Sequence, residues 1–540
     1  KRQNLYDVRR KADLLKEDNA MRCKTLYENG RIYTMDEEMP YAEWVAVDEG
    51  RIAAIGRGKA PQTIEACRVI DLEGMTMLPG LFDSHMHGTP TGASLSDVDL
   101  TNAANIKDVL DLIEEAAAGK NDDSWITCSC LDSSKLAEKR APLCTEIDRV
   151  SGKHPVYIKN MTLHGCTINT KAMDLIKVPD NLKGIVTDDN GERTGEFSSD
   201  DSANYIANTI NDMTPDSQVR KYIRDCADWC ASKGCTTISG LDGGLFDKTD
   251  RDFYMWMNME KDLPIHVEHF FQTLNVEHAR ALGLPRVGGC ICLDGAGFEG
   301  TMATREPYND GPFPTGVLYY TDDEIYNFMW NANKHGMQFG IHALGDRAID
   351  QYLRCYERVY KELGLEGNPL HNRIEHFTMV HPEHIEKAVK MGLILSMQPR
   401  FTYKWDNPAT EEGHAYESMM PKASVDWIEP YTKILEAGGI IAGGSDSPVT
   451  PVDPVFGIYA LCNMPNETKR VSVTDAIKAF TINGAIANFK EDEKGSITIG
   501  KNADFTVLDR DPYEEPEAIC DFKVMKTIVC DRLVYSGKEK

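Results

Sequence analysis

Four short apolar runs that lie far apart in the chain each carry, at or near their ends, residues that bind metal ions. The runs and their ligand candidates are 81–87 with His85 and His87, 338–342 with His342, 373–376 with His376, and 440–446 with Asp446. Side chains two residues apart on a strand point to the same face, so the two histidines of the first run can bind one ion. Imidazole and carboxylate are common ligands of Zn²⁺, Fe²⁺ and Mn²⁺. We therefore expect the chain to fold so that these distant strand ends meet around a metal ion.

These runs belong to a longer alternation of strand-like and helix-compatible segments. The eight strand-like runs are 81–87, 235–239, 264–270, 290–294, 338–342, 373–376, 393–398 and 440–446. Eight parallel strands joined by crossover helices form a (β/α)₈ barrel of the TIM type, in which the reacting groups lie at the carboxyl ends of the strands. We therefore predict an α/β chain with such a barrel over residues 79–489.

The segments outside the eight repeats predict further structure. The stretch from about 88 to 230 is far too long for one crossover helix, and we expect it to form an insert in the barrel. Short β runs separated by glycines occur in 21–78 and again in 490–540, which predicts a small β-sandwich domain formed from both chain ends. Residues 1–20 are charged with interspersed apolar residues, which is typical of an arm that packs on a neighbouring subunit. We accordingly expect a homodimer or a higher homo-oligomer.

Charge and cysteine content narrow the classes of partner. The 540-residue chain has a formal charge of −26, which argues against a nucleic-acid or anionic-membrane partner. Its 15 cysteines form no regular framework, which predicts reduced thiols. No apolar stretch approaches membrane-spanning length, and the first residues lack the apolar region of a signal peptide. These features together favour a cytoplasmic protein.

Several motifs resemble those of the amidohydrolase superfamily, in the branch that contains N-substituted formamide deformylases (amidohydrolase family 3). The matching segments are 78–87, 341–349, 373–376, 444–449 and 494–504. The resemblance extends from about residue 25 to 535, and it implies a hydrolase with a divalent metal. His154-Pro155-Val156-Tyr157 together with His164 resembles the insert, which in this branch contributes a pocket histidine. The resemblance therefore adds His164 to the substrate-binding candidates.

The fourth predicted strand departs from the pattern of the branch. Its relatives usually carry a lysine four residues before an Asp-Gly pair, and that lysine, when carboxylated, bridges two metals. Here Cys290 stands at that position, before Asp294-Gly295. Some related D-aminoacylases resemble this chain in using a cysteine as a metal ligand. Cys290 is therefore either a thiolate ligand or a packed thiol beside a single metal. We expect one or two ions, with zinc favoured and iron or manganese as alternatives.

Four further residues are weighed for roles in the chemistry. Asp446 is the candidate proton shuttle, although Ser445-Asp446-Ser447-Pro448 also reads as a helix start. Arg305 and Arg400 lie at the bases of two long loops and are candidates for holding a substrate carboxylate, with solvated surface arginine as the alternative. Phe401 is a candidate pocket wall, with ordinary loop packing as the alternative.

The sequence thus favours a metal-dependent amidohydrolase that cleaves a carbon–nitrogen amide bond with metal-activated water. A small-molecule amide is the expected substrate, because the loops after the first, fourth and seventh strands are all long and meet at one rim. Two alternatives stay open. One is a deaminase of a ring amidine or amine, and the other is a non-catalytic barrel that serves as a scaffold.

Overall fold

The computed structural model describes most of the chain in two compact units. The described residues are 21–120, 124–161, 165–243, 250–297, 300–309, 313–409, 412–414, 416, 418, 420 and 427–537. The first unit comprises the described residues of Lys1–His87, Ala227–Leu241 and Met257–Lys540, and the second comprises those of Gly88–Cys226 and Asp242–Trp256. The N-terminal arm expected over 1–20 lies outside the described residues.

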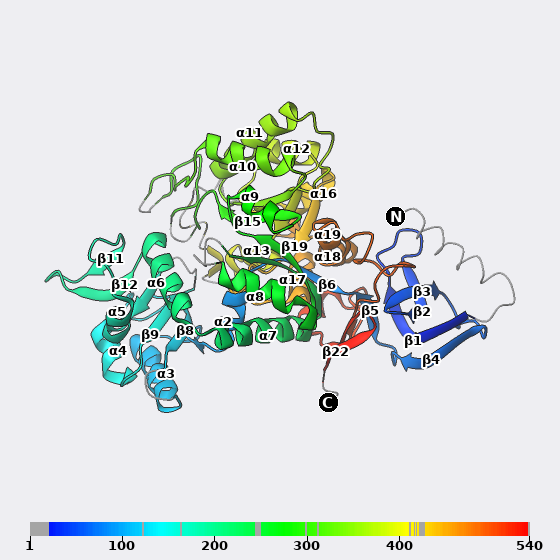
Figure 1. The fold of residues 1–540 in the computed structure, drawn as a ribbon, viewed down its shortest axis with the longest axis horizontal. Coiled ribbons are helices and arrows are strands. Elements are labelled where there is room, and N and C mark those ends of the chain that lie inside the picture. The colour runs from blue at the N-terminus through cyan, green and yellow to red at the C-terminus, as the bar shows by residue number, and fades with distance from the viewer. Residues whose placement is uncertain are drawn as a thin grey trace. The chain divides into compact units, whose positions relative to one another are not determined.

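Eight parallel strands form the barrel of the first unit (Figure 1). In chain order they are β6 (Leu81–Met86), β13 (Cys235–Asp242), β14 (His266–Phe271), β15 (Arg286–Cys292), β16 (Gln338–Ala343), β17 (Arg373–His376), β18 (Ile394–Met397) and β19 (Ile440–Gly443). The ring closes just beyond β6 and β19, where Asp446 N–H donates to His85 O at 2.7 Å and His87 N–H donates to Ser447 O at 2.9 Å. Each of the eight predicted runs is a strand, so the predicted fold class is confirmed.

Helices lie between these strands in the sequence and follow the last of them. Their bounds are α7 (Asp216–Ser232), α8 (Arg251–Met259), α9 (Val276–Ala281), α10 (Asp322–Lys334), α11 (Asp346–Glu362), α12 (Pro382–Lys390), α13 (Pro399–Trp405), α16 (Tyr431–Glu436), α17 (Pro454–Cys462), α18 (Val473–Ala479) and α19 (Ile482–Ile486). Helix α10 shows how the local sequence fixes the start of a helix. Thr321 accepts a hydrogen bond from Glu324 N–H, and the Glu324 carboxylate accepts one from Thr321 N–H, which satisfies two otherwise free donors.

Two glycines allow the close approaches that the barrel interior requires. A Cβ on Gly444 would lie 2.7 Å from His85 N, so a larger residue there would push the end of β19 away from β6. A Cβ on Gly340 would lie 2.6 Å from Glu375 Oε1. Glycine at these two positions therefore leaves room for the carboxyl end of β6 and for the Glu375 carboxylate of β17.

Strands from both chain ends join in one eight-stranded sheet. They are β1 (Met21–Tyr33), β2 (Tyr41–Asp48), β3 (Arg51–Gly56), β4 (Ile64–Asp71), β5 (Thr76–Pro79), β20 (Phe505–Leu508), β21 (Val524–Val529) and β22 (Arg532–Ser536). Antiparallel pairing of β5 with β20 connects the two ends, and Tyr27 packs edge-on against Phe505 with ring centroids 5.5 Å apart. In Figure 1 the blue N-terminal strands and the red C-terminal strand accordingly belong to one sheet.

The second unit has its own sheet and its own core. Its six strands, in the order β11-β12-β10-β9-β8-β7, are β7 (Val98–Asp99), β8 (Ile126–Leu131), β9 (Val156–Asn160), β10 (Cys166–Ile168), β11 (Ile185–Thr187) and β12 (Arg193–Phe197). The accompanying helices are α2 (Gly88–Ser94), α3 (Ile106–Ala118), α4 (Cys144–Ser151), α5 (Thr170–Ile176) and α6 (Asp200–Met213). Ile126, Ile147 and Val156 are fully buried in one apolar cluster of this unit. The residues between the first and second barrel strands thus form a packed body rather than a long loop.

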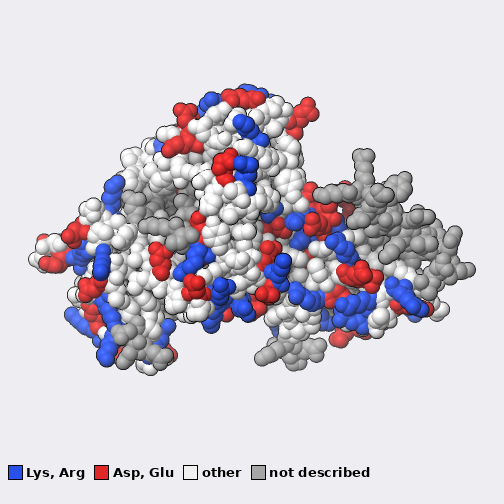
Figure 2. All heavy atoms as spheres, in the orientation of Figure 1, with Lys and Arg blue, Asp and Glu red and all other residues white. Residues whose placement is uncertain are grey.

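The surface carries both signs of charge. Figure 2 shows acidic and basic side chains interspersed over one face of the molecule, although the chain as a whole has a formal charge of −26. The acidic excess is therefore not gathered into a single patch among the described residues of that face. Within the described ranges, no helix has both the length and the apolar character needed to cross a membrane.

An ion pair fills the interior of the barrel. The Arg373 guanidinium on β17 donates two hydrogen bonds of 2.8 Å to the Glu375 carboxylate, and neither side chain is exposed to solvent. The other contacts of this guanidinium, on strands around the barrel, are with Ser84 O, Ser396 Oγ, Ser239 Oγ and the ring of Phe270. A charge without access to water needs such partners, so Arg373 ties strands together while it neutralises Glu375.

Replacing Arg373 with Met should lower the free energy of unfolding by about 3–5 kcal/mol, because Glu375 would then be a buried charge without its cation. Urea unfolding followed by tryptophan fluorescence measures this effect. The control is Arg354→Met, which removes an exposed ion pair with Asp322 and should cost at most about 1 kcal/mol. Equal unfolding midpoints for the two variants would contradict the role given to Arg373.

Candidate metal centre

The centre begins with two histidines and an aspartate at the closure of the barrel. Nε2 of His85 and Nε2 of His87 each lie 3.2 Å from Asp446 Oδ1. His85 is fully buried and Asp446 is 7% exposed. Neither His85 Nε2 nor Asp446 Oδ1 has a hydrogen-bond partner among the described residues. Buried polar atoms are normally paired, so these two atoms face a point where a further group belongs.

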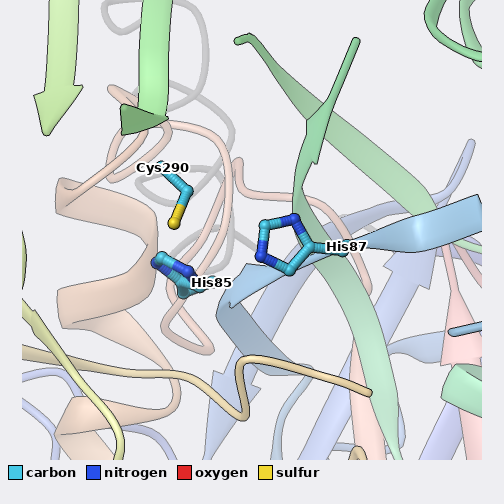
Figure 3. A group of neighbouring side chains, drawn as sticks. All are labelled: His85, His87 and Cys290. Atoms are coloured by element: carbon cyan, nitrogen blue, oxygen red, sulfur yellow. The ribbon is translucent and has the colours of Figure 1, made fainter. Parts of the chain in front are cut away.

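The other predicted ligands lie around the same point. Cys290 Sγ lies 3.6 Å from His342 Nδ1 and 4.0 Å from His376 Nε2. Figure 3 shows the side chains of His85, His87 and Cys290 pointing toward one another. Three overlapping groups have all their ligand atoms within 4.8 Å of one another, namely His85–His87–Cys290, His85–His376–Asp446 and Cys290–Cys292–His342. The structure thus brings all six predicted ligands into one cluster, with His342 on the side of the two thiols.

Hydrogen bonds from behind orient the imidazoles. Nδ1 of His85 lies 2.7 Å from the Glu375 carboxylate, Nδ1 of His87 lies 3.0 Å from Leu241 O, and Nδ1 of His376 lies 2.7 Å from Gln398 Oε1. A ring that donates from Nδ1 in this way presents an unprotonated Nε2 to a metal. In three of the four histidines Nε2 is therefore the ring nitrogen left to bind a metal.

The backbone at the centre is held under local strain. Asp83, which is buried, accepts hydrogen bonds from the N–H groups of His85 and Ser445 and so links the ends of β6 and β19. His376 and Asp446 both have left-handed backbone conformations, with φ of 73° and 54°. Such conformations are unfavourable for residues other than glycine and persist where surrounding contacts enforce them. The strain aims these two side chains at the centre.

The charges of the cluster match a divalent cation. Burial alone would raise the pKa of Asp446, but His85 and His87 outweigh it and hold the pKa well below its usual range. Burial alone would lower the pKa of His85, but the Asp446 and Glu375 carboxylates raise it to about 9. The pKa of Glu375 falls to about 2 because Arg373 and His85 outweigh its burial. The ionised Asp446 carboxylate beside the Nε2 atoms of His85 and His87 is part of a donor set that fits Zn²⁺ or a similar ion.

A second thiol takes part in the cluster. A hydrogen bond with Cys292, together with burial, raises the pKa of Cys290 well above its usual value. Burial opposes protonation of His342, but Cys292 and Asp294 outweigh it and raise the pKa of that imidazole. Cys292 was not among the predicted ligands. Its spacing of two residues from Cys290 on one strand, the same signal that singled out His85 and His87, points to it.

The predicted substrate-binding residues have different surroundings. The Arg305 guanidinium is bonded to Asp350 and Glu383 at 2.7–2.8 Å, so its donors are already used within the protein. Arg400 lies over the ring of Phe456, with its guanidinium carbon 4.4 Å from the centroid, and burial lowers its pKa. His164 lies outside the described residues.

Phe401 forms an apolar wall directly against the metal centre. Its ring is parallel to that of His376 within 10°, with centroids 6.3 Å apart, and it packs on Trp405 with centroids 4.6 Å apart. Both aromatic side chains belong to a buried cluster whose other fully or nearly buried members are Met302, Tyr308, Leu344, Met379, Tyr416, Met420 and Ile428. The cluster keeps water from one face of His376.

Comparison with known proteins gives the same picture. YtcJ of Bacillus subtilis (strain 168) is 28% identical over 95% of this chain and 99% of its own length. N-substituted formamide deformylase of Arthrobacter pascens is 24% identical over 94% of this chain and 97% of its own. The crystal structure of an uncharacterised metal-dependent hydrolase from Pyrococcus horikoshii OT3 superposes with a TM-score of 0.74 at 22% identity, covering 90% of this chain and 98% of that one, and supports the fold.

The family model described as the amidohydrolase family matches residues 68–535. That range includes the barrel, all six clustered ligands and the strands that join the two chain ends. The expected family resemblance is confirmed, and the chain belongs to the amidohydrolase family.

Proposed function

We propose that this amidohydrolase is a zinc enzyme that hydrolyses the carbon–nitrogen bond of a small-molecule amide. The observation that carries the proposal is the position of Asp446 Oδ1, which is buried, lacks a hydrogen-bond partner among the described residues and lies 3.2 Å from both His85 Nε2 and His87 Nε2. A carboxylate so placed is close to the metal and to any water that the metal activates. The name of the Arthrobacter pascens relative, an N-substituted formamide deformylase, supports amide chemistry.

The roles of the residues follow from their positions. The histidines, Asp446 and Cys290 would hold the metal, which when bound supplies a water of lowered pKa and polarises the substrate carbonyl. Asp446 accepts the proton of the attacking water and returns it to the leaving nitrogen. Glu375 and Gln398 keep the imidazole rings fixed, so that little reorganisation is needed during the reaction.

The surroundings of the centre favour a substrate with an apolar part. Phe401 and Trp405 offer aromatic surface beside His376, which suits the hydrocarbon portion of an amine or acyl group. Arg400 is the better candidate for an acidic substrate group, because Arg305 is already paired with Asp350 and Glu383. The homo-oligomeric state, the cytoplasmic location and the lack of a nucleic-acid or membrane partner stay predictions.

A screen of N-acyl and N-formyl amines with the zinc-loaded protein tests the proposal. Release of an amine together with a carboxylate supports it. Release of ammonia from a ring amidine or amine would establish the deaminase alternative instead. Lack of zinc binding together with lack of turnover would leave the scaffold alternative.

Asp446→Asn should keep the fold and lower kcat by on the order of 10²–10⁴-fold, because asparagine retains an acceptor oxygen but cannot carry the proton. The measurement is kcat on an amide identified in the screen, with zinc content determined on the same preparation. A variant with normal zinc content and near-normal kcat would remove Asp446 from the proton transfer.

Cys290→Ser should lower the zinc content and the rate, since a serine hydroxyl is a much poorer zinc ligand than a thiolate. The matched control is Cys128→Ser, which changes a fully buried thiol in the core of the second unit. Metal analysis after dialysis distinguishes the two. If both variants keep the zinc content and rate of the unmodified chain, Cys290 is a packing residue only.

A further inference from the structure

A second cluster of metal-ligating side chains lies at the other end of the barrel strands. His266 is the first residue of β14, Asp504 immediately precedes β20, and Cys530 lies in the turn between β21 and β22. One ligand atom of each residue lies within 4.8 Å of those of the other two. The candidate metal centre described above is built at the carboxyl ends of the strands, whereas His266 is at the amino end of its strand. The two clusters are therefore separate.

Two distances in this cluster are close to those of a tetrahedral site. His266 Nε2 lies 3.4 Å from Asp504 Oδ2 and 3.8 Å from Cys530 Sγ. Bonds of roughly 2.0 Å to nitrogen and oxygen and 2.3 Å to sulfur place tetrahedral ligand atoms roughly 3.3–3.7 Å apart. Only small side-chain adjustments would thus bring all three atoms onto one ion.

Asp504 supplies an independent indication of a ligand. Its residue is 5% exposed, and Oδ1 accepts a hydrogen bond of 2.8 Å from Cys530 N–H. Oδ2, which faces His266 and the thiol, is buried and makes no hydrogen bond to any described residue. His266 Nε2 lies 3.4 Å from this oxygen, which is within the distance of an ion pair with a protonated imidazole. An ionised oxygen in this position calls for a cation.

The charged groups near this cluster are compatible with a bound metal cation. Lys494 is a buried amine that is 3% exposed, its Nζ lies 3.4 Å from Thr237 Oγ1, and burial lowers its pKa, which disfavours its charged form. Burial raises the pKa of the Cys530 thiol to about 11, while Lys494 and Arg51 act in the opposite direction. The thiol is consequently protonated without a metal, and an ion that binds there releases this proton to solvent.

We propose that His266, Asp504 and Cys530 form a second zinc site, with the fourth position filled by water. Borderline ligands of this kind (imidazole, carboxylate and thiolate) suit Zn²⁺ better than Mg²⁺ or Ca²⁺, which prefer oxygen ligands only. The ion would link the first residue of β14 in the barrel to the turn that joins β21 and β22 in the sheet of the chain ends. The ion would have a structural role and would not take part in the reaction.

Thiol labelling of the full-length protein tests this site directly. Cys67, Cys520 and Cys530 are all exposed, so each should react with iodoacetamide in the chelator-treated protein. Added Zn²⁺ should slow the labelling of Cys530 about tenfold or more, because a metal-bound thiolate is withdrawn from reaction. The rates at Cys67 and Cys520 should not change. Peptide mass spectrometry reads all three rates in one sample, independently of enzyme activity.

A matched pair of histidine variants decides whether the protection comes from this cluster. His266 and His335 both have side chains that are 30% exposed and both lie near a carboxylate. His266→Gln should abolish the zinc protection of Cys530, and His335→Gln should retain it. Zinc analysis after dialysis should show about one ion fewer per chain in His266→Gln. Labelling of Cys530 at the same rate with and without Zn²⁺, or protection that survives His266→Gln, would overturn the proposal.

Discussion

The ion pair between Arg373 and Glu375 is the interaction on which both the barrel and its metal centre depend. Taking two charges out of water is costly, and the cost is offset only when every donor and acceptor finds a partner. Here Arg373 reaches a backbone oxygen on β6 and a hydroxyl oxygen on β18, and Glu375 holds Nδ1 of His85. The same carboxylate therefore neutralises the barrel interior and fixes the orientation of a ligand. Glycine at position 340 leaves the room that this carboxylate occupies. A change in the packing of the barrel around Glu375 would consequently alter the orientation of His85 at the metal centre.

The fold and most of the ligand cluster could be predicted because both leave recognisable patterns in short stretches of the sequence. A buried parallel strand is a short apolar run, and a ligand at its carboxyl end is visible as the residue that ends the run, as with His342 and His376. Contacts made through space have no such signature. That Glu375 faces His85, and that Gln398 faces His376, depends on how β6, β17 and β18 are placed side by side. The ion pairs of Arg305 are another example, because its partners, Asp350 and Glu383, come from two different helices and could not be identified from the sequence around Arg305.

Sulfur gives this centre a character different from one built of histidine and carboxylate alone. Cys290 stands where relatives in the branch usually have a lysine, and Cys292 lies on the same side of the strand, with its thiol in the same cluster as His342. Thiolates donate more charge to a metal than imidazoles do, and they favour softer ions. The choice of metal by this chain is therefore expected to rest on the two thiols, while the proton chemistry rests on Asp446. Cys290 and Cys292 lie on β15, and Asp446 lies just beyond the end of β19.

The pairing of β5 with β20 has a consequence for the folding of the protein during its synthesis. Pro79 pairs with Phe505, and β6 meets the residues that follow β19, so segments that lie far apart in the sequence are neighbours in the finished sheet and barrel. Until β20 and the residues after β19 have been synthesised, one edge of β5 and one edge of β6 are unpaired, and His85 and His87 have no Asp446 opposite them. Contacts of such long sequence separation form slowly and leave intermediates prone to association. The nascent chain thus cannot complete the cluster of His85, His87 and Asp446 before β19 and the residues after it are made, so we expect a metal ion to bind there only at a late step of folding.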